Sequence, residues 1–271
     1  MPIQILLART VLAVDAGSRG VSVLLALSDR DSSLWPRAVL SRENLIDGLY
    51  TFLNNAGMPD ISQVVLCGMG CHDTKEESAQ ERASRMERWR EELRQSGGDP
   101  LACIHADMEG WEVQVLLEEL KQEFGDVLAM DSGIAAVFAA LSIDALRDRS
   151  WNEGVTIVYA GHSHTQAFMV FREKILGLYE QHAGLDREQL LNDLKEVRLN
   201  WLPDEQVRAA GGHGCICGDF PPEAEGFRPT WVLGPRRLDL EGCGRMASPC
   251  GLDAFERCYG MVYGLTRREN A

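Results

Sequence analysis

The stretch that decides the fold is Val155–Phe171, which reads VTIVYAGHSHTQAFMVF. Val155–Tyr159 is apolar and rich in β-branched residues, and after Gly161 the apolar character resumes. We predict two strands joined by a tight turn, because glycine and small polar residues break an extended run. Such a turn suits an anion such as phosphate, and an ordinary polar hairpin is the alternative. The turn residues, which offer backbone N–H groups, two imidazoles and two hydroxyls, are Gly161, His162, Ser163, His164 and Thr165.

The same pattern occurs near the start of the chain. The apolar segment Val11–Asp15 precedes Ala16-Gly17-Ser18-Arg19-Gly20, and a second apolar run, Val21–Leu27, follows. We predict another strand, small-residue turn and strand. Asp15 would end the first strand, where a carboxylate could hold a metal-bound or nucleophilic water. The alternative for Asp15 is a turn aspartate that caps its own backbone.

Composition limits the class of protein. The chain has 271 residues, is 45% hydrophobic and carries a formal charge of -14. The charge argues against nucleic-acid and anionic-membrane partners, which require basic surface. It does not argue against a nucleotide or another small molecule, which local donors can bind. Eight cysteines in this length do not resemble a secreted disulfide framework, so we expect a reducing, cytoplasmic setting.

Strands and helices alternate in both halves. Val127–Met130 predicts a strand that leads into Asp131-Ser132-Gly133 and a small-residue helix. The charged segment Arg147–Gly154 is the expected boundary, which gives lobes at residues 1–150 and 151–271. We therefore predict an α/β protein of two related lobes, with a ligand between them.

Imidazoles and a carboxylate recur in the second half of the chain. Such groups are suitable ligands for zinc, iron or manganese, or general acid/base groups near neutral pH. The alternative is that each histidine only hydrogen-bonds a turn. The predicted set is His164, Glu180, His182 and His213.

Several uncommon strings occur together: VLAVDAGSRGVSVLL, MDSGIAAVFAAL, AGHSHTQAFMV, GLYEQHAG, AAGGHG, GPRRL and SPCGLDAFERCYGMVYGL. In these strings the chain resembles an uncharacterised prokaryotic family that carries the name pyruvate formate-lyase activating enzyme-related. That family is similar to the actin, sugar-kinase and heat-shock-chaperone ATPase superfamily. The resemblance is dense in the second half of the chain and sparse in the first.

The resemblance implies two ribonuclease H-like lobes, as in actin-like ATPases, with ATP and magnesium between them. It implies a phosphotransferase or ATPase. The candidate catalytic residues are Asp15, at its strand end, and His164, as an acid/base group of the imidazole cluster. Arg19, His162 and Gln181 depart from the residues expected at their positions, and Arg19 motivates the alternative of a non-catalytic binding or regulatory module. The residues implied to bind the nucleotide are Gly17, Ser18, Asp131, Gly133, Gly161, Ser163 and Thr165, with Ser132 at the cleft border.

The family name itself does not fit the cysteines. A radical activating enzyme holds its iron–sulfur cluster with cysteines spaced C-x3-C-x2-C. Cys67 and Cys71 give the first interval, but Thr74 stands at the third position. We therefore expect no radical iron–sulfur chemistry from this segment.

Overall fold

The computed structural model describes residues 9–17, 20–28, 30–68, 79–109, 113–182, 184, 186–251 and 253–270. Ser18, Arg19, Cys71 and Thr74 lie outside the described residues. The chain forms two compact units. Unit 1 comprises Met1–Cys71, Leu101–Ser142 and Pro249–Ala271, and unit 2 comprises His72–Pro100 and Ile143–Ser248.

Unit 1 is built on a five-stranded sheet of order β3-β2-β1-β4-β5. The first three strands are antiparallel, whereas β1, β4 and β5 run parallel to one another. Residues of β1 and β4 are buried on both sheet faces, which explains their nearly continuous apolar sequences. The strands are β1 Val11–Gly17, β2 Gly20–Ala26, β3 Arg37–Leu40, β4 Gln63–Gly68 and β5 Val127–Asp131.

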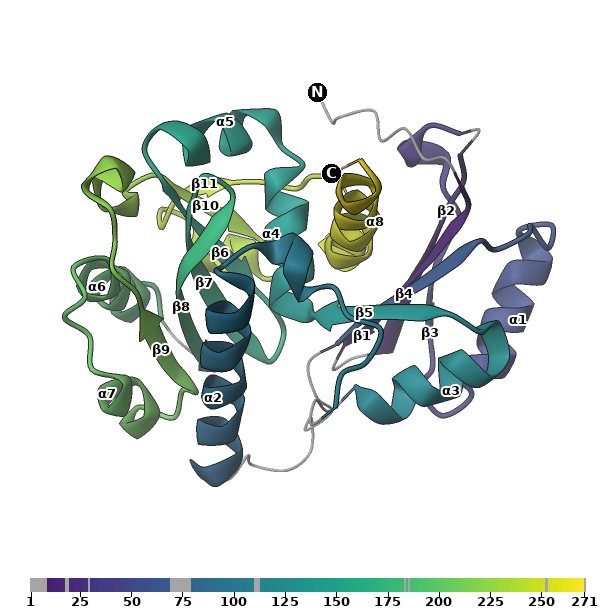
Figure 1. The fold of residues 1–271 in the computed structure, drawn as a ribbon, viewed down its shortest axis with the longest axis horizontal. Coiled ribbons are helices and arrows are strands. Elements are labelled where there is room, and N and C mark those ends of the chain that lie inside the picture. The colour runs from purple at the N-terminus through teal and green to yellow at the C-terminus, as the bar shows by residue number, and fades with distance from the viewer. Residues whose placement is uncertain are drawn as a thin grey trace. The chain divides into compact units, whose positions relative to one another are not determined.

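Helices cover both faces of this sheet. Figure 1 shows α1 and α3 on one side of it and α8 on the other. Helix α4 is buried along its whole length, as its apolar and small residues SGIAAVFAAL require, and it packs against α8. The helices of unit 1 are α1 Leu45–Asn55, α3 Gln114–Phe124, α4 Ser132–Leu141 and α8 Glu256–Glu269, with short 3-10 helices at Ser32–Leu34, Pro100–Cys103 and Asp253–Phe255.

Unit 2 repeats the topology. Its six-stranded sheet has the order β11-β10-β6-β7-β8-β9, so β8-β7-β6-β10-β11 corresponds strand for strand to β3-β2-β1-β4-β5. This is the ribonuclease H-like order, and the predicted fold class of two related α/β lobes is confirmed. The strands are β6 Val155–Ala160, β7 His164–Phe171, β8 Lys174–His182, β9 Gly214–Cys217, β10 Thr230–Leu233 and β11 Arg245–Met246.

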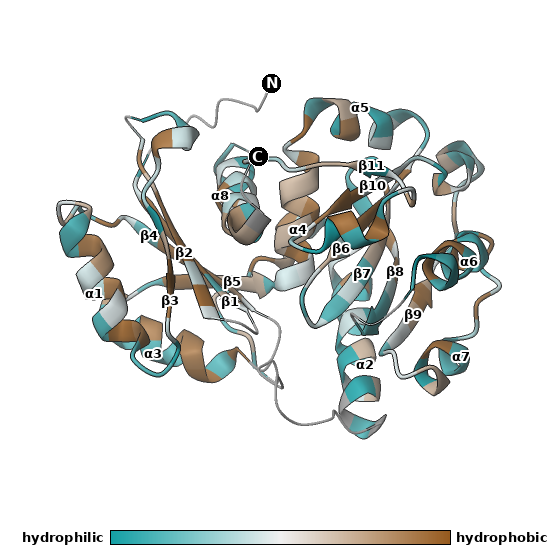
Figure 2. Cartoon of the chain, turned by 180° about the vertical axis from the view of Figure 1, so that it is seen from behind, coloured by the Kyte–Doolittle hydropathy of each residue, from teal (hydrophilic) through white to brown (hydrophobic). Residues whose placement is uncertain are grey.

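The two faces of this second sheet bury different helices. Helix α6 packs its leucines against Val158, Ala167 and Met169 on one face. On the other face Trp89 of α2 lies against Phe168, with ring centroids 5.9 Å apart. Figure 2 shows the hydrophobic residues among the strands of this sheet and the many hydrophilic residues of α2. The helices of unit 2 are α2 Ala79–Ser96, α5 Asp144–Asn152, α6 Arg187–Arg198 and α7 Asp204–Ala209, with 3-10 helices at Pro222–Phe227 and Arg237–Leu240.

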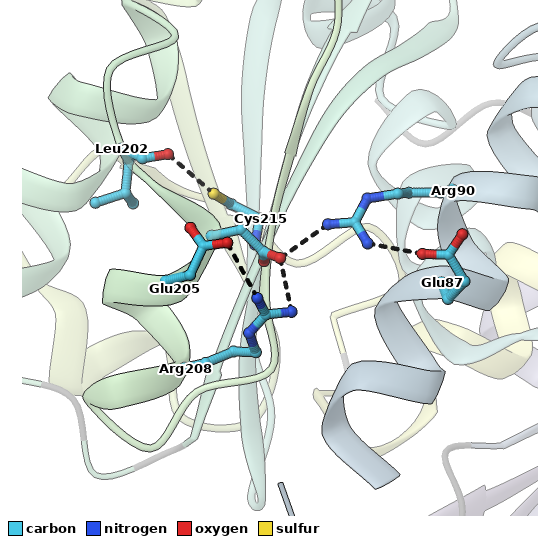
Figure 3. Close-up of polar contacts among 7 residues, drawn as sticks. Glu87, Arg90, Leu202, Glu205, Arg208 and Cys215 are labelled. Atoms are coloured by element: carbon cyan, nitrogen blue, oxygen red, sulfur yellow. Dashed lines mark hydrogen bonds and ion pairs between the residues drawn. The ribbon is translucent and has the colours of Figure 1, made fainter. Parts of the chain in front are cut away.

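Polar contacts fix α2 within unit 2 (Figure 3). Arg90 forms an ion pair with Asp204 of α7 at 2.9 Å, and the other carboxylate oxygen of Asp204 accepts the backbone N–H of Cys215 in β9. Arg208 also contacts Asp204, at 2.8 Å. The three elements α2, α7 and β9 are therefore joined through one carboxylate.

The units differ from the lobes expected at residues 1–150 and 151–271. Residues 72–100 belong to unit 2 because the side chains of α2 contact β7, β8 and α7. Residues 249–271 return to unit 1, where α8 packs on β1, β2 and β4. Chain order alone does not reveal either exchange. Among the described helices, none combines the length and apolar composition needed to cross a membrane.

Candidate functional site

The parallel strands of unit 1 bring two carboxylates to one edge of the sheet. In the register of the sheet Asp15 lies beside Cys67, and Gly68 lies beside Asp131. Because β1, β4 and β5 run in the same direction, these residues all stand at carboxyl ends of strands. This is the edge at which α/β sheets present their ligand-binding residues.

Asp15 is buried, at 4% exposure. One of its oxygens, Oδ2, lies 3.0 Å from Nε of Arg257, and Oδ1 accepts a hydrogen bond from the Cys67 thiol at 3.5 Å. Burial raises the pKa of Asp15, although Arg257 and the Cys67 hydrogen bond oppose the shift. Burial, with the neighbouring Asp15 carboxylate, raises the pKa of the Cys67 thiol well above its usual range.

Gly17 keeps the Arg257 guanidinium close to the backbone. A Cβ at position 17 would lie 3.3 Å from Nη2 of Arg257 and 3.4 Å from the carbonyl oxygen of Gly20. Gly20 has a φ of 142°, a conformation that side chains disfavour. The β1–β2 hairpin thus has the small-residue backbone expected from the sequence, with a guanidinium beside it.

Helix α8 carries Arg257 and is positioned by close helix packing. A Cβ at Gly260 would lie 2.0 Å from the carbonyl oxygen of Ala135 in α4. A Cβ at Gly264 would lie 2.6 Å from the Phe138 ring. Glycine at these two positions lets α8 approach α4 closely, which sets the first turn of α8 against β1.

Asp131 has a clear structural role at the same edge. Its Oδ1 accepts the backbone N–H of Gly133 at 2.6 Å and so caps α4. Asp131, Ser132 and Gly133 are all buried. Their expected place at the border of a cleft and their predicted contact with a nucleotide stay predictions.

In unit 2 the predicted turn joins β6 and β7. The N–H of Gly161 donates to the carbonyl oxygen of His164 at 2.9 Å, and Ala160 pairs with Thr165. The N–H of Arg236 donates to the carbonyl oxygen of Ala160, so the turn after β10 adjoins this hairpin. Gly161, Ser163 and His164 are half-buried, whereas Thr165 is buried.

The structure gathers three of the four predicted metal ligands. Candidate ligand atoms of His164, Glu180 and His213 all lie within 4.8 Å of one another. Glu180 Oε1 is 3.2 Å from Nδ1 of His213, and the two imidazole ring centroids are 4.6 Å apart. His182 stands outside this group: it pairs with His164 in the β7–β8 register, but it is exposed and its Nδ1 accepts the N–H of Gly184.

Glu180 is fully buried and keeps its charge. Arg85 Nε lies 2.8 Å from Oε1, and the Gln166 side-chain amide donates to Oε2 at 3.2 Å. Burial by itself raises the pKa of Glu180, but attraction to Arg85, His213 and His164 outweighs it and lowers the pKa to about 2. The carboxylate is therefore ionised at physiological pH.

Several residues of these two centres were not predicted from the sequence. Arg257 lies 242 residues from Asp15 along the chain, and Arg85 lies 95 residues from Glu180. Arg85 stands in a charged helical segment that looks like ordinary solvated surface, whereas Arg257 stands in a largely apolar segment in which no local pattern points to Asp15. The sequence around Cys67 and Gln166 also contains no pattern that marks either residue as a neighbour of Asp15 or Glu180.

Comparison with known proteins assigns the family. A family model described as "Putative pyruvate format-lyase activating enzyme (DUF1786)" matches residues 35–238. The chain belongs to this family. No curated protein matched the sequence.

Solved structures resemble the chain at low sequence identity. The activator of 2-hydroxyisocaproyl-CoA dehydratase from Clostridium difficile, with bound ADPNP, is 9% identical, with 96% of each chain covered and a TM-score of 0.46. Component A of (R)-2-hydroxyglutaryl-CoA dehydratase from Acidaminococcus fermentans is 9% identical, with 97% of this chain and 100% of that chain covered and a TM-score of 0.48. A Bacteroides thetaiotaomicron protein of unknown function with an actin-like ATPase fold is 9% identical, with 92% and 95% covered and a TM-score of 0.49. These similarities concern the course of the chain and not its chemistry.

Proposed function

We propose that the protein binds a nucleoside triphosphate such as ATP and acts as an ATP-dependent phosphotransferase or ATPase. The observation that carries the proposal is the buried Asp15–Arg257 pair at the end of β1, beside the glycine hairpin. A strand-end carboxylate and a guanidinium beside the glycines that flank a hairpin turn are groups that phosphoryl transfer can use for positioning and charge stabilisation.

Arg257 supplies the positive charge for a phosphate group. Its Nε is engaged with Asp15, and its Nη2 lies near the backbone of Gly17. A guanidinium is planar and donates in several directions, so it can contact a carboxylate and a phosphate oxygen together. Gly17 leaves room for the phosphate to approach the backbone, because no side chain stands there.

Asp15 is the acidic group of the proposed reaction. Its raised pKa brings the carboxyl group closer to the range in which it can accept a proton from an attacking hydroxyl or water. Arg257 and Cys67 hold its two oxygens in a fixed orientation. Asp15 would therefore orient the nucleophile, with Asp131 at the same edge of the sheet, two strands away.

Magnesium fits this arrangement poorly as a direct ligand of Asp15. Both oxygens of the carboxylate already accept hydrogen bonds, and the side chain is almost entirely buried. Arg257 neutralises the charge that would attract the ion. We therefore assign no step to a magnesium–Asp15 bond.

A non-catalytic nucleotide-binding module is the second candidate. The same ion pair favours it, because a carboxylate neutralised by Arg257 is a weaker base than an unpaired one.

The radical chemistry in the family description has little support from Cys67. Its thiol is fully buried, donates to Asp15 and has a raised pKa, whereas a cluster ligand must be a thiolate.

The test is a calorimetric titration of the full chain with ATP, followed by a phosphate-release assay. Asp15→Asn keeps the shape of the side chain, and Asp47→Asn on the exposed surface of α1 is the matched control. We expect wild type and Asp47→Asn to bind and turn over ATP, and Asp15→Asn to lose turnover. Binding without turnover in all three proteins would favour the non-catalytic module, and absence of binding would remove both candidates.

A further inference from the structure

The cluster of His164, Glu180 and His213 lies on one face of the unit 2 sheet. His164 begins β7, Glu180 lies near the end of β8, and His213 directly precedes β9. The backbone N–H of His213 donates to the carbonyl oxygen of Glu180 at 3.1 Å. Two adjacent strands and the residue at the start of a third therefore hold the three side chains, and the backbone hydrogen bond of His213 to Glu180 ties that third position to the sheet.

The donor set matches a transition-metal site. Two imidazoles with one carboxylate is the ligand combination of many zinc and non-haem iron(II) centres, which keep a further position open. The candidate ligand atoms lie within 4.8 Å of one another, close enough to converge on one ion after small side-chain rotations. His164 is half-buried whereas Glu180 and His213 are buried, so the site is accessible from the side of His164.

The surroundings of Glu180 resemble the outer shell of a metal centre. Ligating carboxylates usually accept hydrogen bonds that fix their orientation. Arg85 contacts Oε1 of Glu180 and Gln166 donates to Oε2. The single positive charge of Arg85 is sufficient to balance the negative charge of the Glu180 carboxylate. A purely structural ion pair would need no imidazoles, yet two of them converge on the same group.

We propose that His164, Glu180 and His213 bind a divalent transition-metal ion, zinc or iron(II), with one position left for solvent or a substrate. Arg85 and Gln166 are positioning residues that orient the carboxylate. The site lies wholly within unit 2 and does not depend on nucleotide binding.

The first experiment measures metal binding by the untagged full chain. Elemental analysis after purification is followed by calorimetric titration of the metal-free protein with zinc and, anaerobically, with iron(II). His164→Gln and His213→Gln are the test variants. His182→Gln is the matched control, since the same residue type lies opposite His164 on the neighbouring strand but outside the cluster.

We expect wild type and His182→Gln to bind a single ion equally tightly. Both cluster variants should lose more than the roughly 10- to 100-fold in affinity that follows loss of an outer-shell partner. Circular dichroism checks that each variant is folded. Failure of wild type to bind either metal would overturn the proposal, as would an equal loss of affinity in His182→Gln.

The second experiment uses Arg85→Met, which removes the positive charge that faces Glu180. If the cluster binds a metal, added zinc supplies a replacement charge and should raise the melting temperature of this variant more than that of wild type. The gain should disappear in Arg85→Met/His213→Gln. If zinc raises the melting temperature of Arg85→Met/His213→Gln as much as that of Arg85→Met, the ion does not bind at this cluster.

Discussion

Replacement of Arg257 with methionine is the perturbation that tests the candidate site of unit 1 most quantitatively. Methionine keeps an unbranched apolar side chain but removes the guanidinium that lies 3.0 Å from Asp15. The Asp15 side chain is 5% exposed and the Arg257 side chain 14% exposed, so water replaces little of the lost interaction. An uncompensated buried charge destabilises a protein by about 3–5 kcal/mol.

The loss of stability should depend on pH. The pKa of Asp15 in the folded protein is already raised, so the folded state binds this proton more tightly than the unfolded state. Protonation of Asp15 therefore stabilises the folded protein. This contribution is complete below the pKa of Asp15 in the unfolded chain, about 3.9, and is lost as the pH rises through the pKa of Asp15 in the folded protein. In Arg257→Met the opposing attraction disappears, the folded pKa rises further, and the loss extends to higher pH.

Urea unfolding at about pH 5 and about pH 8 measures this effect, with a maximum slope of about 1.4 kcal/mol per pH unit for a single proton. Arg257→Met should be closer to wild type at the lower pH. Asp15→Asn/Arg257→Met should recover much of the stability at the higher pH, because no buried charge remains. Arg268→Met is the control on the same helix: its guanidinium donates to the carbonyl oxygen of Ile104, so its effect should not vary with pH. Equal destabilisation by Arg257→Met at both pH values, with no recovery in the double variant, would refute the reasoning.

Three further predictions concern packing and the hairpin. Gly260→Ala should destabilise the protein by at least about 1–3 kcal/mol in thermal unfolding, because its Cβ would lie 2.0 Å from the carbonyl oxygen of Ala135. A variant as stable as wild type would contradict the close packing of α8 on α4. Trp89→Ala should lower the free energy of unfolding in urea by about 3–5 kcal/mol, since the buried indole packs on the sheet of unit 2. A smaller decrease than in the control Trp201→Ala, where the indole is exposed, would contradict this prediction. Gly17→Val should weaken ATP binding in calorimetry, because the new side chain would occupy the space beside Nη2 of Arg257; unchanged affinity would argue against phosphate approach at this position.

The sequence predicted the elements that depend on local pattern. Both hairpins were predicted because apolar runs on either side of a glycine turn identify strands without knowledge of their partners. The repeated topology followed from that pattern. Arg37–Leu40 and Gly214–Cys217 were not predicted as strands, because each has four residues and its pairing with β2 or β8 supplies the order that its sequence lacks.

The candidate site was predictable only in part, for the same reason. Asp15 stands next to its hairpin in sequence, so strand and turn signals located it. Arg257 reaches Asp15 only because α8 returns to unit 1 at the end of the chain. Of the four metal ligands predicted from the sequence, His182 was included because it recurs with the others at the motifs of the second half. Its side chain turns toward Gly184, which local sequence does not reveal.

A crystal structure of the full chain soaked with a non-hydrolysable ATP analogue tests the central claim most directly. The account predicts electron density for the phosphates at the β1–β2 hairpin, within hydrogen-bond distance of the Arg257 guanidinium and the backbone at Gly17. Phosphate density away from Arg257 and Gly17, or a bound analogue that leaves this edge of the unit 1 sheet untouched, would contradict it.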